Sequence, residues 1–101
     1  MEDEYPLLLD TFLDDSQKRL RQLQKAKTVQ ELGEAAHTLK GSSSNMGAVK
    51  LADLCRQMEV CITQQPLRGV EYLLNRIDQE VALVLKLCRE ERRRFPSSPV
   101  R

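Results

Sequence analysis

The chain has 101 residues, of which 41% are hydrophobic, 31% charged and 4% aromatic, and its 16 Lys and Arg nearly balance its 15 Asp and Glu. This length accommodates one small domain, and the formal net charge of +1 excludes a chain-wide field that would attract nucleic acid or an anionic membrane. The longest apolar runs, such as residues 7–9 and 81–85, are far shorter than the ~20 residues of a membrane span, and the acidic N-terminus is unlike a secretory signal. We therefore expect a cytoplasmic protein that recognises its partners through local surfaces.

The first predicted helix begins near Pro6, which suits a first helical turn, and continues to about Ala26 with apolar residues at spacings of three and four. A second helix is predicted to start after Thr28, because the segment 28–31 (Thr-Val-Gln-Glu) has the form of a capping box. It is expected to end at Gly47, where a left-handed cap forms easily. Its predicted inward stripe consists of Val29, Leu32, Ala36, Leu39, Ser43 and Met46.

A third helix follows directly and is stopped by Pro66, and a fourth runs from about Val70 through Cys88 into an Arg-rich end. Four amphipathic helices joined by short loops predict an all-α protein, an antiparallel up-down four-helix bundle. The bundle is expected to occupy residues 1–94 and to be followed by a Pro/Ser-rich tail at residues 95–101. The apolar stripe of the third helix is Leu51, Leu54, Cys55, Met58, Cys61 and Ile62.

The three cysteines, Cys55, Cys61 and Cys88, are odd in number and lack the CxxC spacing of many metal sites. This pattern predicts neither a disulfide framework nor a zinc site. Free cysteine behaves as a small hydrophobic residue, so we expect these thiols to lie in the core.

Charge is distributed unevenly between the two ends of the chain. Residues 1–17 carry six acids and no base, whereas residues 86–101 carry six bases and two acids. This asymmetry is typical of helix-dipole matching followed by a solvated tail. The alternative is a non-catalytic helical adaptor that binds protein or nucleic acid through the basic end from Arg89 to Arg94, although no aromatic residues alternate with these arginines.

One face of the second helix lies outside the predicted core. At 100° per residue, His37 lies roughly 140° from the centre of the inward stripe, Gly41 almost opposite it, Ser44 about 120° and Lys40 about 80° away. These residues form a solvent-facing strip at spacings of three and four, and His37 is the only histidine of the chain.

The residue types on this strip favour chemistry on a phosphoryl group. A glycine inside a helix costs about 1 kcal/mol relative to alanine, and at an outward position such as Gly41 its missing side chain leaves room for a visiting surface. An exposed neutral imidazole has one free lone pair and can act as a nucleophile, while Lys40 can stabilise an anionic phosphoryl group. Taken singly, His37 and Lys40 are typical of ordinary solvated surface residues; their combined spacing favours a site.

The segment from His37 to Ala48 (His-Thr-Leu-Lys-Gly-Ser-Ser-Ser-Asn-Met-Gly-Ala) resembles the signature of histidine-containing phosphotransfer domains of bacterial multistep phosphorelays. The resemblance covers roughly residues 5–90. The compact chain looks like a free-standing member of that family, although an excised C-terminal domain of a hybrid sensor kinase would look the same. On the next helix, the similarity extends to Leu51, Ala52, Leu54, Cys55 and Glu59.

The resemblance implies that Nε2 of His37 accepts a phosphoryl group from the phospho-aspartate of a hybrid sensor kinase's receiver domain and passes it to the receiver domain of a response regulator. It further implies that Lys40 steadies the phosphoryl oxygens, that Gly41 lets the receiver approach, and that the Ser44 hydroxyl contacts the receiver or the phosphate. Glu59 matches a position from which the family accepts the Nδ1 proton of the histidine; an ordinary surface role is the alternative for this glutamate.

The sequence contains no GxxxxGK[ST] loop, no glycine-rich kinase loop and no metal-ligand spacing. We therefore expect no cofactor and no metal, and a phosphocarrier without ATP-dependent kinase activity of its own. The near-neutral charge and short loops favour a monomer that binds receiver domains, with no nucleic-acid or membrane partner.

Overall fold

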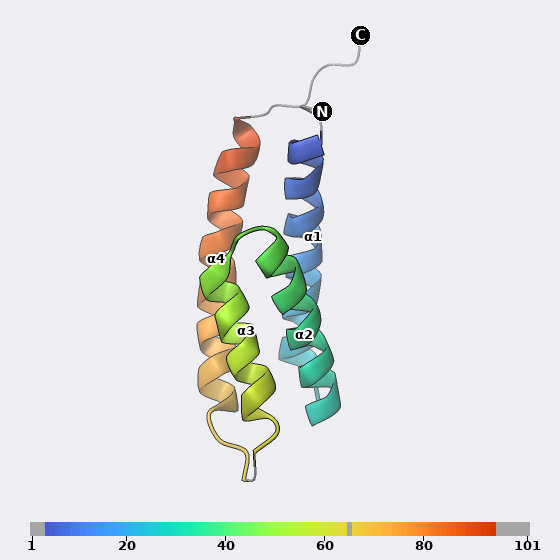
Figure 1. The fold of residues 1–101 in the computed structure, drawn as a ribbon, viewed down its shortest axis with the longest axis vertical. Coiled ribbons are helices and arrows are strands. Elements are labelled where there is room, and N and C mark those ends of the chain that lie inside the picture. Colours follow the sequence, from blue (N-terminus) through green and yellow to red (C-terminus); the bar gives the residue numbers. More distant parts are fainter. Residues whose placement is uncertain (1–3, 65, 95–101) are drawn as a thin grey trace.

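The computed structural model describes residues 4–64 and 66–94, which form four helices: α1 Glu4–Lys25, α2 Val29–Asn45, α3 Val49–Cys61 and α4 Val70–Arg93. Helices α1 and α3 each pack against both α2 and α4. Successive helices run in opposite directions (Figure 1). The predicted all-α antiparallel bundle is confirmed, whereas the predicted tail at residues 95–101 lies outside the described residues.

Both ends of α2 are fixed by the local chemistry that the sequence predicts. The backbone amide of Glu31 donates to Oγ1 of Thr28 at 3.1 Å, and the Glu31 carboxylate accepts from the Thr28 amide at 3.3 Å, which completes the capping box. After α2, Gly47 adopts a left-handed conformation with φ of 78°, which costs glycine little. The chain therefore enters α3 two residues later, and α2 and α3 form a tight antiparallel pair.

The core is built from the apolar stripes of all four helices. The buried thiols of Cys55 and Cys61 belong to it, and Cys88 is partly buried against it, as expected for free cysteines. One predicted core residue is wrong: Val29 is 41% exposed, because it is the first residue of α2 and stands at one end of the bundle. The largest fully buried hydrophobic side chains are Leu9, Leu23, Leu39, Leu51, Met58, Ile77 and Val81.

Helices α1 and α4 are longer than α2 and α3. They continue beyond the turn that joins α2 to α3 (Figure 1). At this end, Nε of Arg92 donates to the Asp10 carboxylate at 2.9 Å and so ties α4 to α1. Arg94 pairs with Glu91 at 3.1 Å within its own helix end. Part of the basic segment singled out in the sequence is thus neutralised within the bundle.

Candidate functional site

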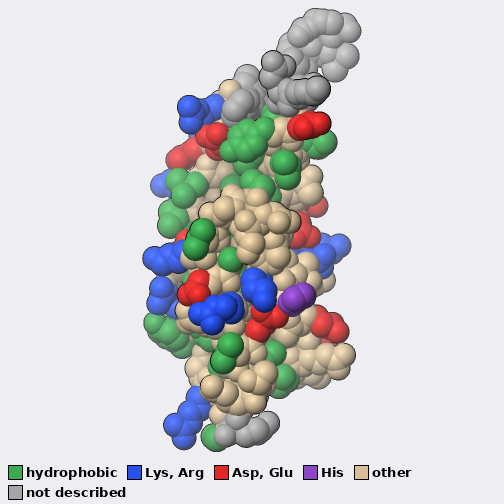
Figure 2. Space-filling model, viewed as in Figure 1, with side chains coloured by type: hydrophobic (Ala, Val, Ile, Leu, Met, Phe, Trp, Pro, Cys, Tyr) green, Lys and Arg blue, Asp and Glu red, His purple; other side chains and the backbone are tan. Residues whose placement is uncertain are grey.

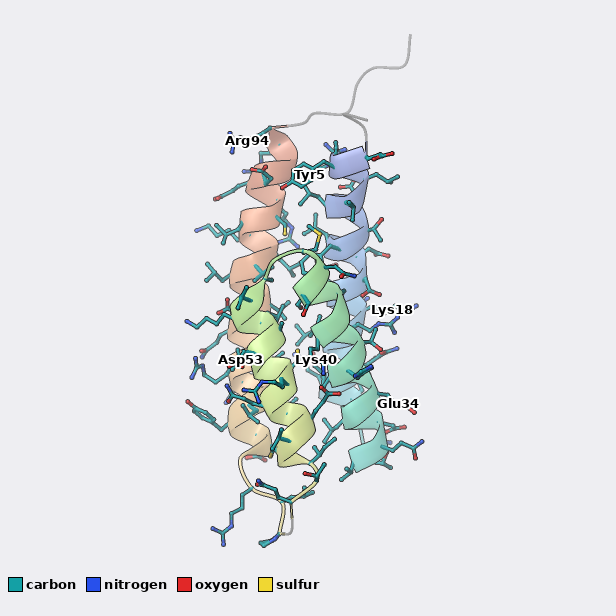
Figure 3. All side chains as sticks on the ribbon, viewed as in Figure 1. Tyr5, Lys18, Glu34, Lys40, Asp53 and Arg94 are labelled. Carbon is teal, nitrogen blue, oxygen red and sulfur yellow. The ribbon has the colours of Figure 1, made fainter. Side chains whose placement is uncertain are left out.

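The strip predicted on the outer face of α2 is present, and it displays the imidazole to solvent. The His37 side chain is 71% exposed, and Gly41 and Ser44 are also exposed. The imidazole stands clear on the surface in the space-filling view (Figure 2). Lys40 is only 33% exposed because it leans from the strip toward α3 (Figure 3).

The carboxylate of Glu59, on α3, bridges two residues of α2. Its Oε2 lies 2.9 Å from Nδ1 of His37, and its Oε1 lies 2.6 Å from Nζ of Lys40. An ionised carboxylate can only accept hydrogen bonds, so the neutral imidazole must carry its proton on Nδ1. Nε2 is then left with its lone pair free, on the side of the ring turned away from Glu59.

Glu59 remains ionised although it is only 25% exposed. Partial burial raises the pKa of its carboxyl. Hydrogen bonds from Lys40 and His37 and the charge of Lys40 lower this pKa by a larger amount in sum, so the net pKa lies below the ordinary value. The charge of Glu59 is therefore maintained by the two residues that it binds, which keeps the Nδ1 proton in place.

The other candidate nucleophile near the site is a buried thiol. Cys55 lies one helical turn before Glu59 on α3 and is fully buried, and burial raises its pKa to about 12. A thiol with this pKa is protonated at neutral pH and is a poor nucleophile. Of these two groups, only the imidazole is presented to solvent.

Gly41 leaves an open space on the strip, because it has no side chain. A Cβ placed on Gly41 would meet nothing within 4 Å, so no contact inside the described structure requires glycine there. Ser44, one turn further along, is exposed on the same strip. Within the described residues no contact joins its hydroxyl to the imidazole, so Ser44 belongs to the strip by position only.

Two features of the site were not found from the sequence. The first is the ion pair of Lys40 with Glu59, because spacing within one helix does not show which residue of the next helix lies opposite. The second is Gly33, where a Cβ would lie 2.9 Å from Cδ1 of Ile62; glycine here lets α2 approach the end of α3. The one signal in the sequence was a glycine inside a predicted helix, and it does not show which helix lies opposite.

Within residues 4–64 and 66–94, no group of three or more His, Cys, Asp or Glu side chains could hold a metal ion. In the same part of the chain, no helix combines the length and the apolar character that crossing a membrane requires. What the site offers is a single oriented imidazole, a carboxylate behind it and open space beside it.

A bundle that carries such an imidazole on its second helix has the architecture of a histidine phosphotransfer domain. The sequence matches the Hpt domain family over residues 7–87, and the chain belongs to this family. Hpt domains are phosphotransfer intermediates that interact with receiver domains, and the chain has a histidine phosphotransfer role in phosphorelays.

A solved structure gives a more particular likeness. The chain is similar to histidine-containing phosphotransfer protein B (HptB) from Pseudomonas aeruginosa PAO1, with 43% sequence identity and a TM-score of 0.86. The similarity covers 95% of this chain and 86% of HptB. No curated protein matches the sequence at a significant level.

Proposed function

We propose that His37 is the residue that carries the phosphoryl group between two receiver domains. The observation that supports this most directly is the hydrogen bond at 2.9 Å between Nδ1 and Glu59, because it leaves the lone pair of Nε2 free on a side chain that is 71% exposed. The donor is the receiver domain of a hybrid sensor histidine kinase, and the acceptor is the receiver domain of a response regulator.

In the transfer step, the Nε2 lone pair attacks the phosphorus of the donor's aspartyl phosphate. The N–P bond forms as the P–O bond to the aspartate breaks, and the bonding electrons leave with the aspartate carboxylate. The Nδ1 proton stays on the ring, so the phosphorylated imidazole carries a positive charge. The Glu59 carboxylate stabilises this charge, and transfer to the second receiver reverses the same step.

Lys40 and Glu59 have supporting roles in this proposal. Glu59 is a positioning residue that selects the tautomer and orients the ring. A phosphoryl group on Nε2 brings negative charge near Lys40, which then divides its ammonium between Glu59 and the phosphoryl oxygens. Positive charge close to the phosphoryl group favours both its arrival and its retention.

Gly41 and Ser44 form the part of the strip over which a receiver domain approaches. The open space above Gly41 supports this role, since a side chain there would stand between the two proteins. We further propose that the protein works as a cytoplasmic monomer and does not phosphorylate itself from ATP. Its sequence offers no phosphate-binding loop for a nucleotide.

The decisive variant is His37→Gln, which keeps a polar side chain of similar reach and removes the nucleophile. The protein is incubated with ³²P-labelled receiver domains from its own genome, and label on the chain is followed over time. We expect wild-type protein to gain label that is stable to alkali and labile to acid, and the variant to gain none while its circular dichroism melt is unchanged. Label that persists on the folded variant would refute the role of His37.

A further inference from the structure

Three basic side chains of α1, Lys18, Arg21 and Lys25, form a row that is here called the basic row. All three are exposed, and their spacings of three and four place them on one face of the helix. None has an ion-pair or hydrogen-bond partner among the described residues. Within the same part of the chain, five other cations do pair with carboxylates: Arg19, Lys40, Arg56, Arg92 and Arg94.

The basic row faces the N-terminal half of α2, the helix that carries His37. It lines a groove of about 450 Å³ between α1 and α2, together with Glu34 of α2, which precedes His37 by three residues. Lys18 and Glu34 project on the same side of the molecule (Figure 3). The groove thus lies between the basic row and the part of α2 that leads into His37.

The groove keeps an excess of positive charge although two carboxylates line it. Glu31 is held by the capping box, and Glu34 accepts a hydrogen bond from Gln30 at 3.4 Å. Neither carboxylate lies within 4 Å of a cation of the basic row. Like charges three and four residues apart disfavour a helix, and the helix dipole compensates Lys25 in the last turn but not Lys18 two turns earlier. Lys18 and Arg21 therefore have no ion-pair partner among the described residues, and only Lys25 is stabilised by the helix dipole.

We propose that the basic row is an electrostatic docking element for the acidic rim around the phosphorylated aspartate of a receiver domain. This inference rests on the proposed function. A site that holds an aspartyl phosphate and a divalent cation needs several carboxylates, so its rim carries the charge that complements the basic row. Charges at the rim of an interface act mainly on the rate of association and on its salt dependence.

The test compares two charge reversals of equal size. The variant Lys18→Glu/Arg21→Glu alters the basic row, and the control Lys86→Glu/Arg89→Glu changes a Lys and an Arg at the same spacing on α4, which does not pack against α2. Transfer is measured from a ³²P-labelled receiver domain that phosphorylates the wild-type protein, at 20 mM and at 300 mM salt. Phosphoramidate, a small phosphodonor that needs no docking, labels the histidine of each variant as a check of its intrinsic reactivity.

We expect the basic-row variant to lose at least about tenfold in second-order transfer rate at low salt, to show a flatter salt dependence, and to retain wild-type labelling by phosphoramidate. The α4 control should stay within about twofold of wild type, because its charges lie away from the docking face. Equal losses in both variants, or an unchanged rate and salt slope in the basic-row variant, would overturn the docking role alone. Failure of wild-type protein to accept label from any receiver would overturn the proposed function and the docking role together.

Discussion

Two regions of α2, the edge that faces α3 and the outer strip, differ in how they use a glycine. At the edge, the space that a side chain of residue 33 would need is occupied by the tip of Ile62, a residue of the same molecule. On the outer strip, two turns later, Gly41 faces empty space. The closed edge serves the packing of α2 against α3, whereas no internal contact requires a glycine at position 41. Stability and partner binding should therefore be separable by substitutions in one helix.

The largest effect is expected from Gly41→Gln, which places a side chain over the open strip. Glutamine should raise the free energy of unfolding by up to about 1 kcal/mol, because it favours the helix and its Cβ meets no neighbour. It should also slow transfer from a labelled receiver by about 10- to 100-fold, since crowding at a packed interface costs about 1–3 kcal/mol. Urea unfolding and transfer kinetics measure the two effects. An unchanged transfer rate would contradict the role of the open strip.

The matched substitution at the closed edge, Gly33→Gln, should have the opposite pattern. The tip of Ile62 could yield to a methyl group, but a longer side chain must push α3 away from α2. We expect the free energy of unfolding in urea to fall by about 1–3 kcal/mol, and the transfer rate of the folded protein to fall less than in Gly41→Gln. If Gly33→Gln left stability intact and blocked transfer, the distinction between the two regions would be wrong.

The sequence correctly predicts the features that are determined by contacts between residues close together in the chain. The capping box at Thr28 and Glu31, the left-handed Gly47 and the solvent-facing position of His37 each depend on residues within one helix or one turn. Periodicity also separates the core face of α2 from its outer strip, apart from Val29 at the helix end.

Contacts between helices could not be read in the same way. The spacing places Lys40 beside His37, but its ammonium binds the Glu59 carboxylate because the α2–α3 turn brings that residue opposite. In the sequence, Gly33 is only a residue that disfavours a helix; the structure shows that Ile62 packs where its side chain would be. Register between helices is set by turn geometry and by packing of the whole core, and neither has a local sequence pattern.

The contacts of Glu59 with His37 and Lys40 of the outer strip also predict a small pH dependence, which Glu59→Gln should reveal. Hydrogen bonds from Lys40 and His37 outweigh the effect of partial burial and hold the pKa of Glu59 below its ordinary value of 4.5. A carboxyl whose pKa is lowered on folding stabilises the native state above its unfolded pKa and loses that contribution as the pH falls through its folded pKa. The variant should therefore be less stable than wild type at pH 7.

The difference is expected to be under about 1 kcal/mol, because solvent screens a pair at the surface, and to shrink as the pH falls through the folded-state pKa of Glu59. Urea unfolding at a series of pH values measures it, with Asp78→Asn on α4 as a control carboxylate away from His37, one that accepts a single long hydrogen bond from Gln24 at 3.3 Å. A difference that stayed constant from pH 7 to pH 3 would mean that Glu59 stabilises α2 against α3 by packing. Its charge would then have no part in holding His37 and Lys40.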